Sequence, residues 1–369
     1  MHNVVVTGMG FITSIGTDKA TVTESLRSLR HGISVYDRFR ELDAPIHLAG
    51  QVPGFDISSN DPEDWTYPEQ YALKRDQVRS MSPHVLYAHC AMRQAMADAG
   101  LSAEDISDPR TGLFTSSAGS TRLLHYNLGR LLKHGTRRAN PMGIVSSVTG
   151  TLSFNLVALN GIKGASGGFV SACASSGHAL GFAFDEIALG RQDRVIVIGA
   201  EDGDLETILP FAGMRALSPD KEPPGSRPFD KSRNGFVGTG GATCLILESE
   251  ETAKARGANV YARYAGWGQA SDGYNVAISH PEGDGLARAM RIALDASKVN
   301  AADVQYVNAH GTSTPLGDSA EVTAIKRLFG DHAGSLMVSS TKSLTGHTLG
   351  AAGGLETVFT AQAIIKNTA

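Results

Sequence analysis

The sequence predicts an α/β fold in which helices cover a largely parallel sheet. Short runs rich in β-branched and other apolar residues alternate along the chain with longer segments whose apolar residues recur at helical spacing. Hydrophobic residues make up 41% of the 369 residues, which is enough for a large core in one domain or in two coupled halves. The 42 glycines indicate many tight turns or close backbone contacts.

The first half of the chain begins with a predicted strand, "NVVVTG", and a helix over residues 19–29. Residues 41–70 lack periodicity and predict a long surface excursion. A helix is predicted over residues 82–101, because Ser82 and Pro83 suit its start and Gly100 its end; Cys90 then lies on it as a packed residue. Strands follow at 112–116, 168–172 and 194–201, with helices at 142–159 and 175–189.

The second half repeats this alternation after a polar, proline-rich stretch at residues 218–236. Strands are predicted at 240–249, 259–268, 304–311 and 335–341, and helices at 284–296 and 319–329. Neither a short-period repeat nor a low-complexity segment is visible in the sequence.

Composition excludes several classes of function. The net charge of −4 and the isoelectric point of about 6.3 favour neither nucleic acid nor an anionic membrane as the main partner. The amino terminus resembles no signal peptide and no apolar run could span a bilayer, so we expect a cytoplasmic protein. Three scattered cysteines argue against a disulfide framework or a zinc site and predict free thiols.

Cys173 is the first candidate for chemistry. It lies in "FVSACASSGHALGF", between a predicted strand and a predicted helix, and small residues flank it. A helix N-terminus favours negative charge, so both a thiolate and an oxyanion would be stabilised there. A buried structural cysteine remains the alternative, because most cysteines of intracellular proteins are of that kind.

Two later segments carry polar residues at predicted strand ends. "VNAHGTSTPLGD" places His310 before a loop rich in hydroxyl and backbone donors, where a packing role and a catalytic role are about equally plausible. "SSTKSLTGHTLGAAGGLE" holds Lys342 and His347 among small residues, with Glu356 available to pair with a buried lysine. A surface charge and a loop histidine are the plainer interpretations.

Together these residues suit acyl-thioester chemistry. Cys173 offers a nucleophile, His310 and His347 offer neutral donors for a developing enolate, and Lys342 offers an orienting cation. A thiol and an imidazole would also serve a hydrolase, but a hydrolase has no evident use for the second histidine and the lysine.

The chain resembles the β-ketoacyl-[acyl-carrier-protein] synthases, the elongating condensing enzymes of the thiolase-like superfamily. Four motifs match in order along essentially the whole chain, as does the opening "VVVTGMG": "SACASSGHALG", "PFDKSRNGFVGTGG", "NAHGTSTPLGD" and "TKSLTGHTLGAAG". Residues 307–318 look most similar to the fatty-acid elongation branch. Fatty-acid, aryl-polyene and aromatic-polyketide substrates are not separated by the sequence.

The resemblance implies a role for each site residue. Cys173 would accept an acyl chain, and His310 and His347 would hydrogen-bond the malonyl thioester carbonyl during decarboxylation. Lys342 and Glu356 would hold the polar network, with Asp318 as a further supporting residue. Thr312 and Thr314 match the threonines that bind the phosphopantetheine arm, which arrives on the acyl carrier protein. Neither a metal nor a bound cofactor is needed.

The resemblance also implies a five-layered α-β-α-β-α fold made of two similar halves, here residues 1–250 and 251–369, and usually a homodimer. An acidic carrier protein should dock on local positive charge. Two basic segments are candidates, and a solvated helix face is an equally good interpretation of each: Lys74, Arg75 and Arg79, and Arg130, Lys133, Arg137 and Arg138.

Departures from the family pattern keep alternatives open. Relatives usually continue beyond the helix that ends "AQAIIKNTA", with a Gly-Phe-Gly-Gly loop beside the cysteine, so we expect an incomplete sequence. "SSAGSTR" has fewer glycines than the family loop, and "GTGGATC" lacks an acidic residue common in relatives.

A non-catalytic chain-length-factor-like subunit of a heterodimer is one alternative, which the retained cysteine and histidines disfavour. A thiolase is another, but Cys244 lies in a predicted buried strand and is poorly placed as its second cysteine.

Overall fold

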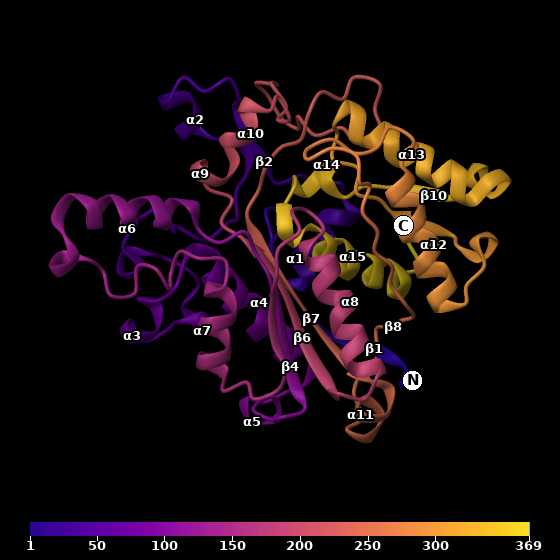
Figure 1. The fold of residues 1–369 in the computed structure, drawn as a ribbon, viewed down its shortest axis with the longest axis horizontal. Coiled ribbons are helices and arrows are strands. Elements are labelled where there is room, and N and C mark those ends of the chain that lie inside the picture. Colours follow the sequence, from indigo (N-terminus) through magenta and orange to yellow (C-terminus); the bar gives the residue numbers. More distant parts are fainter. Residues whose placement is uncertain (369) are drawn as a thin grey trace.

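A six-stranded sheet forms the centre of the structure, a computed structural model that describes residues 1–368 (Figure 1). Its strand order is β5 (Ser166–Phe169), β4 (Thr111–Ser116), β6 (Arg194–Glu201), β7 (Gly241–Ser249), β1 (Val4–Ile12) and β8 (Ala262–Tyr264). A second, two-stranded sheet pairs β9 (Tyr306–Asn308) with β10 (Met337–Ser339), and a hairpin pairs β2 (Ile33–Val35) with β3 (Leu48–Gly50).

The central sheet is mixed, so the prediction of a largely parallel sheet is wrong. Strand β4 is parallel to both of its neighbours, whereas β7 is antiparallel to β6 and to β1, and β8 is antiparallel to β1. Residues 202–240 explain the change of direction. They contain only the short helices α9 (Leu205–Ile208) and α10 (Pro210–Gly213) and cross neither face of the sheet, so β7 starts at the edge where β6 ends.

Five layers follow one another across the molecule, which confirms the predicted α-β-α-β-α arrangement (Figure 1). Helices α4 (Pro83–Ala99) and α7 (Thr151–Asn160) pack on one face of the central sheet. Helices α8 (Ser175–Ala188) and α15 (Ala352–Lys366) pack on the other face. Strands β9 and β10 come next, and α12 (Asp284–Ser297) and α13 (Pro315–Phe329) share a small apolar cluster with Val307 of β9, whereas the residues of β10 are exposed.

Helix α4 has the ends that the sequence predicts. Ser82 is its N-cap, Pro83 its first residue, and Gly100 closes it in a left-handed conformation with a φ of 67°. Glycines of β1 let this helix approach the sheet, because a Cβ atom on Gly10 would lie 1.9 Å from the carbonyl oxygen of Ala91. The apolar side chains between α4 and the sheet form the largest buried apolar cluster among the described residues.

Some boundaries differ from the predicted ones. The segment predicted as a helix over 142–159 is helical only from Thr151, because turns occupy residues 142–150. The predicted surface excursion over 41–70 includes the buried strand β3. The remaining helices are α1 (Lys19–Arg27), α2 (Asp37–Glu41), α3 (Arg75–Val78), α5 (Ala103–Ile106), α6 (Thr121–His134), α11 (Glu250–Ala255) and α14 (Lys342–Thr345).

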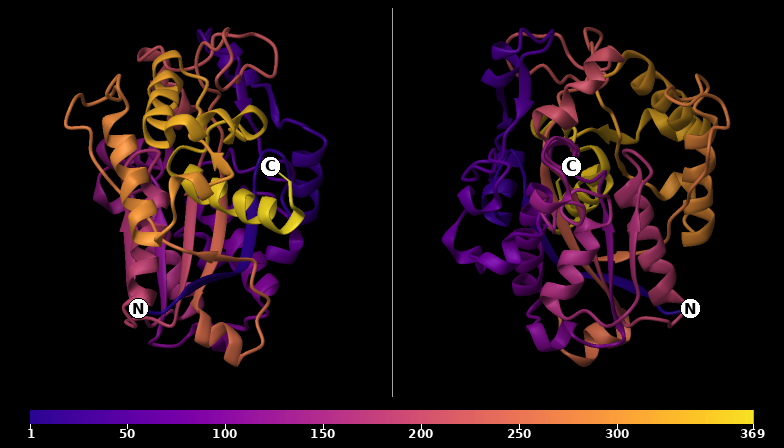
Figure 2. Two further views of the ribbon diagram at one scale, coloured as in Figure 1. Left: turned by 90° about the vertical axis from the view of Figure 1, so that its right-hand side faces the viewer. Right: turned by 60° about the vertical axis from the view of Figure 1, so that its left-hand side comes forward.

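Long connections gather at the edge of the central sheet where β1, β4 and β6 end (Figure 2). Residues 202–240 and the segments around β9 and β10 lie at this edge, so polar groups distant in sequence can meet there. No helix among residues 1–368 combines the length and the apolar character that a bilayer span requires.

Candidate active site

Cys173 lies in a strained turn between β5 and α8, as the sequence predicts. Ala172, just before it, has a φ of 46°, a conformation that residues with a side chain rarely adopt. The hydroxyl of Ser175 stabilises the turn, since it accepts a hydrogen bond from the backbone of Ser171 at 2.8 Å and donates one to the carbonyl of Ala172 at 2.6 Å. Helix α8 begins at Ser175, so its unpaired N–H groups lie beside the cysteine.

Both predicted histidines meet this cysteine. The Sγ atom of Cys173 lies 2.9 Å from Nε2 of His347, and the two imidazole rings lie 5.3 Å apart at an angle of 81°. His347 is buried between the rings of His310 and Phe236, whereas His310 is the more exposed histidine. A thiol and two imidazoles therefore lie within 4.8 Å of one another, although His310 and His347 follow Cys173 by 137 and 174 positions in the sequence.

Desolvation by the surrounding protein keeps all three groups in their neutral forms, although His310 stays partly exposed. Desolvation raises the pKa of the Cys173 thiol, although the nearby Lys342 charge acts in the opposite direction. Desolvation and the Lys342 charge lower the pKa of His310, and they lower the pKa of His347 well below its ordinary value. The expected stabilisation of a resting thiolate by α8 is therefore outweighed by burial, and the imidazoles are available as uncharged donors or acceptors.

The proton of His347 can be assigned from its surroundings. Its Nδ1 atom is buried and has no hydrogen-bond partner among the described residues. An N–H group left unpaired at that position would cost about 1–3 kcal/mol, so the tautomer with the proton on Nε2 is favoured. His347 then presents an N–H donor to Cys173 and to a substrate placed beside it.

Lys342 joins His310 to a buried network of charge. Its ammonium group donates to the carbonyl oxygen of His310 at 2.7 Å and forms an ion pair with Glu356, the partner suggested by the sequence. Burial lowers the pKa of Lys342 to about 8, while Glu321 favours its charged form. Lys342 therefore positions the backbone of His310 instead of extending into solvent.

Glu321 belongs to the site although sequence reasoning did not single it out. One carboxylate oxygen accepts the backbone N–H of His310 and the other that of Gly311, both at 2.7 Å. Burial raises the pKa of this carboxyl group. Glu321 follows Asp318 by three residues and so lies on the same face of α13, a spacing that could have identified it.

Thr312, Thr314 and Asp318 organise the loop after His310. The two threonine hydroxyls lie 3.0 Å apart, and Ser313 between them adopts a φ of 68°. Asp318 is buried, accepts the backbone N–H of Phe229 at 2.8 Å and lies 3.6 Å from the guanidinium of Arg233. It therefore connects residues 229–233 to this loop and does not reach Cys173.

Glu201, another residue that the sequence analysis missed, lies at the buried end of β6. Its Oε1 atom accepts the backbone N–H of Ala118 at 3.1 Å and that of Gly350 at 3.2 Å. Desolvation raises the pKa of Glu201 to about 8. Gly350 follows His347 by three residues, so Glu201 fixes the segment that carries the histidine.

The two basic segments differ in their ion pairing. Arg75, the first residue of α3, and Arg79, which follows its end, are exposed, and both bind the same oxygen of Glu63, at 2.7 and 2.8 Å. Arg137 and Arg138 are exposed in a turn of 3₁₀ helix after α6 and form no ion pair with the described part of the chain. The second segment therefore presents the less neutralised positive charge.

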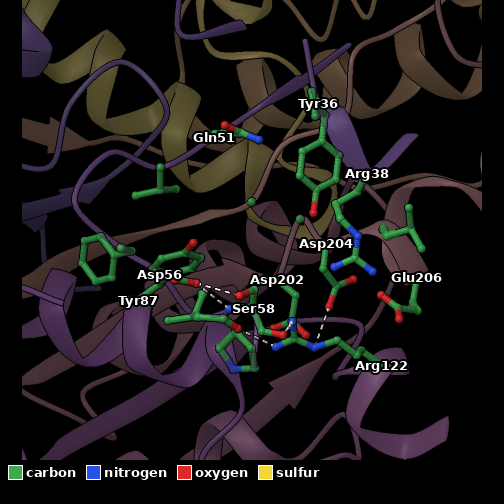
Figure 3. A pocket seen from close by; sticks show the side chains of 18 of the residues that line it. Tyr36, Arg38, Gln51, Asp56, Ser58, Tyr87, Arg122, Asp202, Asp204 and Glu206 are labelled. Atoms are coloured by element: carbon green, nitrogen blue, oxygen red, sulfur yellow. Dashed lines mark hydrogen bonds and ion pairs between the residues drawn. The ribbon is translucent and has the colours of Figure 1, made fainter. Parts of the chain in front are cut away.

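A polar recess of about 380 Å³ lies beyond the end of β6, and none of the predicted site residues lines it (Figure 3). Arg122 donates to the carbonyl oxygens of Ile57 and Ser58 at 2.7 and 2.9 Å and lies 3.5 Å from Asp204. Burial and the neighbouring Asp202 raise the pKa of Asp204 to about 7. These contacts connect residues 57–58 to the segment that follows β6.

A cysteine in a strained strand-to-helix turn, facing two neutral imidazoles and a buried lysine, defines a thiol-dependent acyl-transfer enzyme with a layered α/β fold. The family models agree: the Beta-ketoacyl synthase, N-terminal domain, matches residues 1–253, and the Beta-ketoacyl synthase, C-terminal domain, matches residues 261–369. The chain belongs to the beta-ketoacyl synthase family.

Curated relatives and solved structures place the chain in the same family. It is 39% identical to 3-oxoacyl-[acyl-carrier-protein] synthase 2 of Staphylococcus aureus (strain N315), over 98% of this chain and 85% of the relative. It is 36% identical to 3-oxoacyl-[acyl-carrier-protein] synthase 1 of Haemophilus influenzae, with the same two shares. A beta-ketoacyl synthase from Burkholderia phymatum superposes with a TM-score of 0.89 at 34% identity, covering all of this chain and 87% of that one.

Two further solved structures are also similar. A type II polyketide ketosynthase in complex with its acyl-carrier protein, bound to a hexaketide, has a TM-score of 0.85 at 28% identity. The ishigamide ketosynthase/chain length factor has the same TM-score at 30% identity. In both comparisons the match covers 98% of this chain and 86% of the other. The names of both structures include a ketosynthase, which agrees with the assignment to the beta-ketoacyl synthase family.

Proposed function

We propose that this protein is a condensing acyltransferase that joins an acyl group to malonyl-acyl-carrier protein and forms 3-oxoacyl-acyl-carrier protein with loss of CO₂. The observation that carries the proposal is the 2.9 Å approach of His347 Nε2 to the Sγ atom of Cys173, with His310 beside them. The family and the names of the curated relatives support this reaction.

In the first step Cys173 takes the acyl group. Its sulfur attacks the carbonyl carbon of the acyl thioester, the bond to the carrier thiol breaks, and the proton of Cys173 ends on the departing thiol. The Nε2–H of His347 and the N-terminus of α8 stabilise negative charge on the sulfur as it loses its proton. The strained turn holds the sulfur in the reactive position.

In the second step the malonyl thioester replaces the first carrier. The Nε–H groups of His310 and His347 donate to its carbonyl oxygen, so the electron pair of the breaking C–C bond is held as an enolate while CO₂ leaves. The carbanion attacks the acyl carbonyl, the C–S bond to Cys173 breaks, and the thiolate takes a proton from solvent, because its own proton left with the first carrier thiol. Neutral imidazoles suit this step because both must donate hydrogen bonds without carrying a permanent charge.

The substrates arrive on an acyl carrier protein. Thr312 and Thr314 bind the phosphopantetheine arm in this proposal, and the exposed arginines 75, 79, 137 and 138 attract the acidic carrier. In this proposal neither a metal nor a bound cofactor takes part in either step. Lys342, Glu356 and Asp318 hold the polar network in place. Fatty-acid synthesis and related polyketide or polyene synthesis all use such substrates.

The protein works in the cytoplasm as a homodimer in this proposal. Strand β5 lies at the edge of the central sheet, where a second copy could continue it, and Phe154 and Val170 near this edge expose 54% and 62% of their surface. Sedimentation equilibrium on the full chain would test the dimer.

A non-catalytic chain-length-factor-like subunit is the alternative, and the likeness to a ketosynthase/chain length factor structure is the observation in its favour. The retained Cys173, His310, His347 and Lys342 argue against it, because such a subunit has no use for them. Intact-mass spectrometry separates the two functions. Wild-type protein incubated with an acyl-carrier thioester should gain one acyl group, and Cys173→Ala should gain none; an unmodified wild type would support the non-catalytic subunit.

A further inference from the structure

We infer that Cys173, His310 and His347 together bind a zinc ion in the free protein, and that the bound ion inhibits acylation. Among residues 1–368, these three residues form a group whose ligand atoms all lie within 4.8 Å of one another. The sequence analysis disfavoured a zinc site because the three cysteines are few and scattered. That reasoning left out the histidines that the fold places beside Cys173.

The distances fit a tetrahedral ion after small movements of side chains. Zinc binds thiolate sulfur at about 2.3 Å and imidazole nitrogen at about 2.0–2.1 Å, so two such ligands of one ion lie roughly 3.5 Å apart. The Sγ atom of Cys173 lies 2.9 Å from Nε2 of His347, and all three ligand atoms lie within 4.8 Å of one another. Three protein ligands leave the fourth position for water, as in zinc sites that exchange ligands.

The donor set selects a borderline-soft cation. One thiolate and two imidazoles favour Zn²⁺ over Mg²⁺ or Ca²⁺, which require oxygen ligands. Zinc displaces the proton of the Cys173 thiol, which passes to solvent.

Three features should let zinc at this site exchange rapidly with solvent. His310 is exposed enough for an ion to enter from solvent. Lys342 places a positive charge nearby, which Glu356 and Glu321 only partly offset. When Nε2 of His347 binds zinc its proton must move to Nδ1, where no acceptor is available among the described residues. The last two features weaken binding relative to a structural zinc site.

Inhibition follows from the shared sulfur. An acylated Cys173 cannot bind zinc, and zinc-bound Cys173 cannot attack a thioester, so zinc and acyl donor exclude each other. This part of the inference rests on the proposed function, whereas zinc binding itself does not. Binding is therefore measured without substrate.

The experiment titrates the full chain, freed of metal, with ZnCl₂ and measures bound zinc by equilibrium dialysis. We expect one zinc ion per chain in wild type and in Cys90→Ala, a matched control that removes a buried thiol elsewhere. Cys173→Ala and His310→Ala should each weaken this binding by about 100-fold or more, because losing even an outer-shell partner of a ligand costs 10- to 100-fold. Alkylation of Cys173 in folded wild type should abolish it without any mutation.

A Co²⁺ titration gives a second measurement. Cobalt in the site should show a thiolate-to-cobalt charge-transfer band that is absent in Cys173→Ala. Equal zinc binding by wild type and Cys173→Ala, or the absence of this band, would overturn the inference. If zinc binds through Cys173 but the protein never becomes acylated, the site stands and the proposed function fails. If acylation proceeds and zinc does not slow it, inhibition is wrong.

Discussion

The ammonium group of Lys342 donates a hydrogen bond to the backbone carbonyl oxygen of His310 over 2.7 Å and is paired with Glu356. Glu321 holds the same residue from its N–H side, also at 2.7 Å. His310 is therefore fixed at both ends of its backbone by buried charges from α13 and α14. The imidazole position depends on groups that do not touch the substrate, so Lys342 and Glu321 act as positioning residues.

Replacing Lys342 by methionine should therefore damage both stability and decarboxylation. Glu356 and Glu321 lose their cation, and breaking a buried pair costs about 3–5 kcal/mol of the free energy of unfolding. A displacement of His310 by about 1 Å costs roughly 100-fold in rate. Urea unfolding and malonyl-carrier decarboxylation assays measure the two losses.

A double variant separates the two effects. Lys342→Met with Glu356→Gln also removes the unpaired charge of Glu356, so part of the stability should return while decarboxylation stays slow. Recovery of both quantities would show that Lys342 contributes only to folding.

The two histidines should matter more for decarboxylation than for acyl loading. His310→Ala and His347→Ala each remove one donor to the developing enolate, and one such donor is worth about 10²- to 10³-fold in rate. Acyl transfer to Cys173 should fall much less in His310→Ala; in His347→Ala it should fall less than decarboxylation, because the N-terminus of α8 still stabilises the sulfur. Single-turnover acylation and CO₂ release from malonyl-carrier give the two rates separately. Equal losses in both steps would indicate damage to the structure.

The sequence predicted most elements of this fold because their signals are local. Caps at Ser82 and Gly100 marked α4 correctly, and apolar runs marked β6 and β7 almost to the residue. Strand direction was missed, because antiparallel pairing of β6 with β7 depends on where residues 202–240 run, which no local pattern records.

The site was predicted only in part for a similar reason. Cys173, His310, Lys342 and His347 stand in motifs beside strand ends, and the structure brings all four together. Glu321 and Glu201 act through backbone N–H groups of other segments, so their role appears only once those segments are placed. Burial also reversed one expectation, since the pKa of Cys173 is raised in spite of the helix N-terminus.

Acid should destabilise the wild type partly through His347. The unfolded chain binds a proton at this histidine below about pH 6.5, whereas burial prevents the folded protein from doing so until the pH is much lower. The unfolded state then binds more protons, so this contribution to the free energy of unfolding falls as the pH falls. Between pH 7 and pH 5.5 it amounts to about 1 kcal/mol. The pKa of Glu201 is raised, so its contribution to the free energy of unfolding rises as the pH falls. The pH dependence of wild-type stability therefore combines both contributions.

A comparison of variants isolates the histidine. His347→Gln should lose less stability than wild type between pH 7 and pH 5.5, by about 1 kcal/mol in urea unfolding. Cys90→Ala serves as control, because burial raises the pKa of that thiol to about 12 and it does not titrate in this range. If the free energy of unfolding depends on pH equally in wild type and His347→Gln, His347 becomes protonated in the folded protein.

Carrier docking should depend on the state of Glu63. This carboxylate binds both Arg75 and Arg79, and these hydrogen bonds lower its pKa to about 2, so it stays charged at neutral pH. Glu63→Gln should release the two guanidinium groups for an acidic partner and lower the KM for acyl-carrier protein, whereas Arg75→Ala should raise it. Each change should be several-fold, as is usual for charges at the rim of an interface, and should fade at high salt.

The second basic segment gives the matching test. Arg137 and Arg138 are exposed without a partner among residues 1–368, so the double change to alanine should raise the carrier KM by about 5-fold or more while kcat is kept. Arg291→Ala, an exposed arginine on the distant α12, is the control and should leave KM unchanged. Steady-state kinetics at two salt concentrations measure all four variants. If Arg291→Ala raises KM as much as the others, the carrier responds to total charge and no local docking surface exists on either segment.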